Sequence, residues 1–118
     1  MNKIIVAGSR NVTDYSLVES KLDYYFQNLD PKTIEIVSGG ARGVDKLGER
    51  YAKEHGLACK VFPADWNRFG RSAGYKRNCE MGSYATHLVA FWDGQSPGTK
   101  HMIEYAKKRN LNIRIVKS

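Results

Sequence analysis

Five short apolar runs alternate with amphipathic stretches along this chain, and this alternation limits the possible folds more than any other feature. The runs span residues 3–7, 34–37, 57–62, 87–92 and 113–116, and the first of them is β-branched and almost continuously apolar, as expected of a strand covered on both faces. Between them, apolar residues recur at helical spacing. Because right-handed crossovers return the chain to the same edge, the pattern predicts an α/β, Rossmann-like three-layer sandwich with a mostly parallel five-stranded sheet.

The size of the chain fits one compact domain. Its 118 residues, 42% of them hydrophobic, are enough for a sizeable core and too few for two ordinary domains. We therefore expect a single domain spanning residues 1–118. No run approaches the roughly 20 apolar residues of a membrane span, and the chain enters a short apolar run directly rather than a signal sequence. These features predict a cytoplasmic protein without a membrane partner.

A glycine-rich segment follows the second predicted strand and precedes a helical pattern. It contains Ser38, Gly39, Gly40, Ala41, Arg42, Gly43 and Asp45. Glycines let backbone N–H groups approach a ligand closely, and a helix start adds unpaired donors and partial positive charge. Such a loop suits a phosphate group, although a tight turn without a ligand explains the same pattern. Asp45 either accepts hydrogen bonds from ribose hydroxyls or favours the first turn of its helix.

Three loops are expected to meet in a sheet of this type. Ligands bind beyond the carboxyl ends of parallel strands, where the strand order reverses. The loops after the first, second and fourth strands all lie there, and the first and last of them contribute Gly8, Ser9, Arg10, Trp92, Ser96, Gly98 and Thr99. Their hydroxyl, backbone and guanidinium groups suit a phosphate or ribose phosphate. Neither the GxGxxG fingerprint nor a Walker sequence is present, which argues against an ordinary dehydrogenase or ATPase.

The apolar residues of segment 63–74 follow neither the helical nor the strand periodicity, so the segment is predicted to be a functional loop. It contains Asp65 and Trp66, and Trp66 offers a flat face for a nucleobase. Trp92 ends an apolar strand, where packing is the simpler interpretation. Arg77 and Asn78 begin the next helix and can reach the same crevice, although a surface salt bridge is the simpler interpretation of Arg77.

No residue stands out as catalytic. Asp45, Asp65 and Glu104 are weak candidates for an acid or base, and Asp93 also follows a strand. The two cysteines and three histidines show no metal-binding spacing, so we expect neither a metal nor a cofactor. The formal charge of +7 favours an anionic partner. The predicted helix carries three consecutive apolar residues, 24–26, more than a single core-facing stripe of a helix requires. The extra apolar surface predicts a homodimer or a higher homo-oligomer.

These segments, in this order, resemble the small stand-alone, YspA-related branch of the SLOG superfamily. The resemblance covers nearly the whole chain and rests on residues 6–10, 38–45, 64–66, 70–74, 77–81, 91–92 and 96–99. It implies that the crevice binds a nucleotide or a nucleotide-derived ligand. The implied role is that of a sensor, or of a protein that sequesters a signalling nucleotide, without catalysis.

Two related groups imply alternatives. Lonely-guy enzymes are similar in fold and cleave the base from a nucleoside monophosphate, using an Arg and the Glu of a Pro-Gly-Gly-x-Gly-Thr-x-x-Glu sequence. Here only Pro97, Gly98 and Thr99 match, and Glu104 lies two positions too late, which turns its side chain by about 200° on a helix. A nucleotide hydrolase or phosphoribohydrolase is one alternative. Related DNA-processing proteins bind single-stranded DNA, so nucleic-acid binding is the other, although the sequence shows no continuous basic groove.

Overall fold

A five-stranded parallel sheet forms the centre of the molecule. The computed structural model describes all residues, 1–118, and the strands are β1 (Asn2–Gly8), β2 (Ile34–Ser38), β3 (Ala58–Val61), β4 (His87–Trp92) and β5 (Asn112–Lys117). Their order across the sheet is β3-β2-β1-β4-β5, and every neighbouring pair is parallel. The predicted Rossmann-like α/β sandwich is therefore confirmed. The order reverses at β1, so the carboxyl ends of β1, β2 and β4 flank one crevice.

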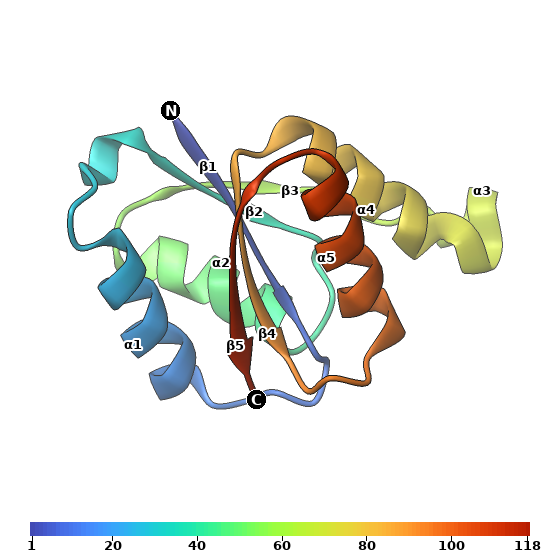
Figure 1. Cartoon of the computed structure of the whole chain (residues 1–118), viewed down its shortest axis with the longest axis horizontal. Coiled ribbons are helices and arrows are strands. Elements are labelled where there is room, and N and C mark those ends of the chain that lie inside the picture. The colour runs from blue at the N-terminus through green and yellow to red at the C-terminus, as the bar shows by residue number, and fades with distance from the viewer.

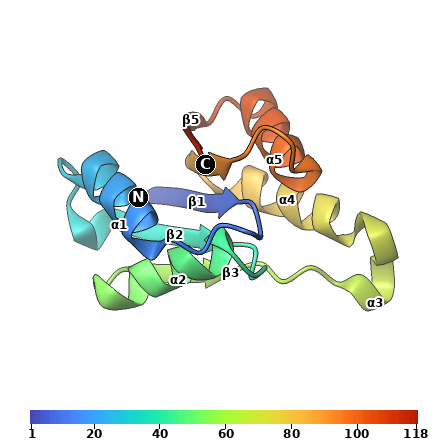
Figure 2. The ribbon, with the colours of Figure 1, turned by 90° about the horizontal axis from the view of Figure 1, so that it is seen from below.

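Helices cover both faces of this sheet, as Figures 1 and 2 show. One face carries α1 (Tyr15–Phe26) and α2 (Val44–Glu54), and the other carries α4 (Ala73–Tyr84) and α5 (Pro97–Lys108). The alternating side chains of β1 serve both layers: Ile4 and Val6 pack with the first pair of helices and Ile5 with the second. All three are almost completely buried, so the central strand fixes the position of the loop that follows it. No helix has both the length and the apolar character needed to cross a membrane.

The third apolar run forms a strand, as predicted, but this strand lies at the edge of the sheet. All four residues of β3 are exposed, because an edge strand has a neighbour on one side only. Its neighbour β2 is mostly buried. The apolar character of residues 57–62 therefore reflects partial packing of Leu57 and Phe62 at the two ends of the strand rather than burial of its middle.

The prediction that segment 63–74 is a loop is wrong. It contains the short helix α3 (Trp66–Phe69) and a 3-10 turn (Gly70–Ser72), which leads directly into α4. The Asp65 carboxylate caps α3 by accepting the backbone N–H of Arg68 at 3.1 Å. One helical turn is too short to produce a periodic pattern, which explains why it was missed. We call residues 66–72 the arm, because Figure 2 shows α3 projecting beyond the sheet from the start of α4.

Candidate functional site

A cleft of about 580 Å³ lies at the carboxyl ends of the central strands. Its walls come from the loops after β1, β2 and β4, from the first turns of α4 and α5, and from the arm. Of the residues predicted for the site, those that line the cleft are Gly8, Ser9, Arg10, Ala41, Arg42, Asp45, Trp66, Arg77, Asn78, Ser96, Gly98 and Thr99. The structure thus brings together the three loops that the sequence placed at one edge.

Other predicted residues lie behind or outside this surface. Ser38, Gly39, Gly40, Gly43, Asp65, Trp92 and Glu104 do not line the cleft. Asp65 is the cap of α3, and Glu104 is exposed on α5. The Trp92 indole N–H donates to the Ser96 carbonyl oxygen at 3.1 Å, and its ring packs against the core on the side of α5. Trp92 therefore holds the loop after β4, as the packing interpretation expected.

The glycine-rich segment uses its polar groups internally. The N–H of Gly40 donates to the Ser38 hydroxyl at 3.0 Å, and the N–H of Ala41 donates to the Asp45 carboxylate at 3.2 Å. The Ser38 hydroxyl in turn donates to Glu49 Oε2 at 2.6 Å, a partner that the sequence did not indicate. These N–H groups already have acceptors, so the segment acts as a wall of the cleft rather than as an open phosphate cradle.

Close packing explains the glycines of this segment. Gly43 has a φ of 81°, and a Cβ there would lie 2.6 Å from the carbonyl oxygen of Ser9. A Cβ on Gly39 would lie 2.7 Å from the Arg77 guanidinium. Gly43 excludes a side chain because backbone atoms lie next to it, whereas a side chain at Gly39 would have to displace the end of the Arg77 side chain. The glycine loop and the loop after β1 are therefore packed against each other directly.

The Ser9 hydroxyl and the N–H groups of the first turn of α5 line the inner end of the cleft. Ser9 is only 4% exposed, and its hydroxyl makes no hydrogen bond within the chain. It lies near enough to Asp93 to help lower the pKa of that carboxyl, but the main causes of the lowering are the backbone N–H groups of Ser96 and Gln95. The same two bonds, each 2.8 Å long, turn the chain into α5. The first turn of α5 then presents N–H groups that have no partner within the helix.

Asp45 is the one buried carboxyl group of the cleft. It is 6% exposed, and burial raises its pKa from 3.8 to about 6. The N–H of Ala41 and the guanidinium groups of Arg77 and Arg10 lower the pKa and offset part of this effect. Asp45 therefore titrates near neutral pH, which is unusual for an aspartate and typical of functional sites.

Four arginines line the cleft: Arg10, Arg42, Arg71 and Arg77. None forms a salt bridge; the only Lys or Arg side chains that do so are Lys46 and Arg50, both on α2. The interpretation of Arg77 as a surface salt bridge is wrong, because its guanidinium is half-buried and donates to the Gly39 carbonyl oxygen at 2.6 Å and to Asn78 Oδ1 at 3.1 Å. Unpaired cations around a concave surface favour an anionic ligand.

The outer end of the cleft is aromatic. Trp66 is 51% exposed, and Tyr75 is 45% exposed, with its ring 4.5 Å from that of His101. Sequence analysis did not select Tyr75 or Arg71, although both lie in a segment rich in aromatic and basic residues. Asn78 ties the two helices at this end, because its amide nitrogen donates to the Gly98 carbonyl oxygen at 3.2 Å.

Comparison with known proteins agrees with this architecture. The model of the YspA, cpYpsA-related SLOG family (YAcAr) matches residues 2–69, which include the loops after β1 and β2. The chain belongs to this SLOG family. The Gene 61 protein of Mycobacterium phage D29 is 32% identical over 96% of the chain and 94% of its own length.

Two solved structures share the fold of this SLOG protein. DNA processing protein A (DprA) from Streptococcus pneumoniae superimposes with a TM-score of 0.79 at 16% identity, over 100% of this chain. The SLOG chain spans 51% of DprA, about half its length. The protein TM1055 superimposes with a TM-score of 0.69 at 20% identity, and the match covers 96% of this chain and 72% of the TM1055 chain. At these identities the likeness extends to the fold of the SLOG domain alone.

Proposed function

We propose that the cleft binds a nucleotide or a nucleotide-derived ligand, and that the protein acts as a sensor or sequesters a signalling nucleotide. The ligand's phosphate lies at the inner end of the cleft, between Ser9 and the first turn of α5, and its base lies against Trp66. This placement differs from a phosphate bound to the glycine-rich segment, because the N–H groups of Gly40 and Ala41 already have acceptors.

One observation carries the proposal: the buried Ser9 hydroxyl without a hydrogen-bond partner. A buried polar group without a partner is costly, by about 1–3 kcal/mol, and such groups in native proteins call for an explanation. A phosphate oxygen would accept this hydroxyl while also accepting the free N–H groups of α5. Arg10, next in sequence and also in the cleft, adds a guanidinium at the same end.

The outer end of the cleft supports the second half of the proposal. The exposed faces of Trp66 and Tyr75 allow a base to stack, and each is connected to the inner end by the continuous lining of the cleft. A volume of about 580 Å³ lies within the range of pockets that hold small ligands. The cleft thus offers polar groups for a phosphate at its inner end and aromatic faces for a base at its outer end.

Isothermal titration calorimetry against nucleoside mono- and diphosphates, cyclic nucleotides and NAD-derived molecules tests this proposal. Ser9→Ala should weaken binding at least tenfold, since a hydrogen bond to a charged group contributes about 1.5–3 kcal/mol. Ser20→Ala, which removes an exposed hydroxyl from α1, is the matched control and should leave affinity unchanged. Arg10→Ala should likewise weaken binding, whereas its control Arg109→Ala, which removes an exposed arginine next to the end of α5, should not. Absence of binding across the panel would overturn the proposal.

A second candidate function is hydrolysis of the bound ligand, and Asp45 is the observation that favours it. A carboxyl group with a pKa of about 6, at the base of the cleft, suits a proton donor or acceptor near neutral pH. Chromatography of each binding nucleotide after incubation tests this candidate. A product that forms with the natural protein and not with Asp45→Asn would support it, whereas binding without any product would reject it.

A further inference from the structure

The arm and the first turn of α4 form a basic and aromatic surface that continues from the cleft. We call it the arm surface and define it as Trp66, Arg68, Phe69, Arg71, Tyr75 and Lys76. Residues 66–79 contain four Lys or Arg residues and no acidic residue. Trp66, Arg71 and Tyr75 also line the cleft, so the two surfaces share one edge.

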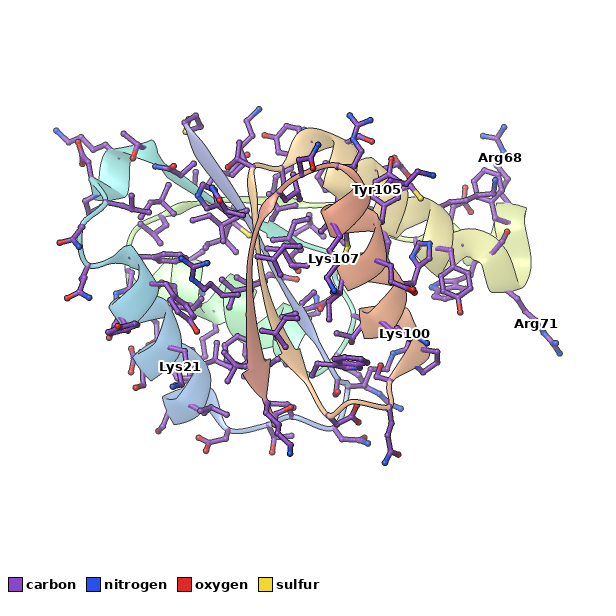
Figure 3. The ribbon with its side chains drawn as sticks, in the orientation of Figure 1. Lys21, Arg68, Arg71, Lys100, Tyr105 and Lys107 are labelled. Carbon is purple, nitrogen blue, oxygen red and sulfur yellow. The ribbon has the colours of Figure 1, made fainter.

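The cations of the arm surface are unpaired, and two of them, Arg68 and Lys76, lie near an aromatic ring. The Arg68 guanidinium lies 5.0 Å from the centre of the Phe69 ring, and the Lys76 ammonium lies 4.8 Å from it. Neither side chain forms a salt bridge. In Figure 3, Arg68 and Arg71 leave the arm in different directions and reach away from the body of the protein. Their charges are therefore available to a ligand that extends beyond the cleft.

The composition of the arm does not follow from a role in the core. None of the residues of α3 or of the 3-10 turn is buried. Trp66 is 51% exposed and Phe69 is only half-buried, so neither aromatic side chain contributes the stability that full removal from water would give. The exposed rings of Trp66 and Tyr75, with cations close to them in sequence, instead match the needs of a surface that binds both bases and phosphates.

We infer that the arm surface extends the nucleotide site to a single-stranded nucleic acid, with its terminal nucleotide in the cleft and the following nucleotides along the arm. This inference rests on the proposed function. A mononucleotide needs one set of phosphate ligands and one base platform. The protein offers further cations outside the cleft, Arg68 and Lys76, beside the Phe69 ring, where a sugar-phosphate chain leaving the cleft along the arm would meet them.

A single strand fits this surface better than a duplex does. Trp66 and Tyr75 expose about half of their surface, so unstacked bases can lie against their rings. In a duplex these base faces are occupied by neighbouring base pairs, and the protein would meet only groove edges and phosphates. Stacking on aromatic side chains and contacts of phosphates with cations are the two interactions that ordinarily bind single strands.

A length series tests the inference. Affinities are measured by calorimetry for 5′-phosphorylated adenylate and thymidylate strands of one, two, four and eight nucleotides. We expect affinity to rise at least tenfold from one to four nucleotides and then to level off, because stacking of one base on an aromatic residue contributes about 1–3 kcal/mol. The mononucleotide should compete with the longer strands, since both occupy the cleft.

Variants locate the gain on the arm. Arg68 and Lys76 do not line the cleft, so the double variant Arg68→Ala, Lys76→Ala should bind the mononucleotide normally and lose most of the gain with length. The slope of log affinity against log salt for the four-nucleotide strand should fall in magnitude by about 0.7 per lost phosphate contact. The control double variant Lys107→Ala, Arg109→Ala removes the same charge from the exposed end of α5.

The outcomes separate the inference from the function on which it rests. If mononucleotides bind and longer strands bind no tighter, the inference is overturned and the proposed function stands. Strand binding that a mononucleotide does not displace, or that the control variant weakens as much as the arm variant, also overturns it. If no ligand of any length binds, the proposed function fails. Circular dichroism of each variant checks that it is folded, which the exposure of all four side chains leads us to expect.

Discussion

Replacement of Asp45 by asparagine should make the protein more stable at neutral pH and leave it nearly unchanged in acid. The carboxyl group is buried, and its pKa is raised from 3.8 in the unfolded chain to about 6 in the folded protein. Asparagine has the same shape and can still accept the N–H of Ala41, but it carries no charge that burial would penalise. The comparison therefore isolates the cost of ionising this one side chain.

The sign and size follow from the two pKa values. Between pH 3.8 and about 6 the folded protein holds the proton more tightly than the unfolded chain, so its free energy of unfolding falls as the pH rises. A pKa difference of about two corresponds to about 3 kcal/mol. Relative to Asp45→Asn, the natural protein should thus lose about 3 kcal/mol over this range and change little above it.

Urea unfolding of both proteins at several pH values from about 3.5 to 8 measures this difference. Titrations common to both proteins, such as those of the surface carboxyl groups, cancel when the two free energies of unfolding are subtracted. A difference that stays constant over the whole range would refute the reasoning, because it would mean that Asp45 ionises as easily in the folded protein as in the unfolded chain.

Two further changes test the packing around the cleft. Gly43→Ala should lower the free energy of unfolding by more than about 1–3 kcal/mol, the cost of a backbone with positive φ alone, because its Cβ would also lie 2.6 Å from the Ser9 carbonyl oxygen. Gly94 has a similar φ of 83° but open space around it, so Gly94→Ala should show the backbone cost alone. Thermal or urea unfolding of both variants measures the difference. Arg77→Lys keeps the charge but cannot reproduce both hydrogen bonds of the guanidinium, to Gly39 and to Asn78, so calorimetry should show nucleotide affinity about tenfold lower. Unchanged affinity would contradict the role of Arg77 in fixing the glycine-rich segment to α4.

The sequence predicted the sheet because the strands that form its core are continuous apolar runs. Residues 3–7 and 87–92 are buried on both faces in the structure, and their alternation with helices left few other topologies. The exposure of β3 could not be predicted, since position at the edge of a sheet depends on strand order and not on the run itself. The arm was missed because a single helical turn is set by its cap, Asp65, and not by periodicity.

The sequence predicted where the cleft lies but only some of the groups that line it. Gly39, Gly40 and Gly43 were selected as ligands of a phosphate, and the structure places them outside the lining of the cleft: Gly39 packs against Arg77, Gly43 packs against the Ser9 backbone, and Gly40 has a φ of 74°. Those contacts join residues far apart in the chain, so no local pattern indicates them. The free hydroxyl of Ser9 is likewise a property of the folded protein, because only the fold removes its alternative partners.

The arm contributes to one wall of the cleft and contributes little to the core. Since none of its residues is buried, its sequence can change with little effect on the core. Replacing residues 66–72 with other short helical turns should therefore alter what the protein binds while its melting temperature stays nearly constant. Under the proposed function, the protein is a scaffold in which the core fixes the inner end of the cleft and the arm can be exchanged to build binders of different nucleotide-containing ligands.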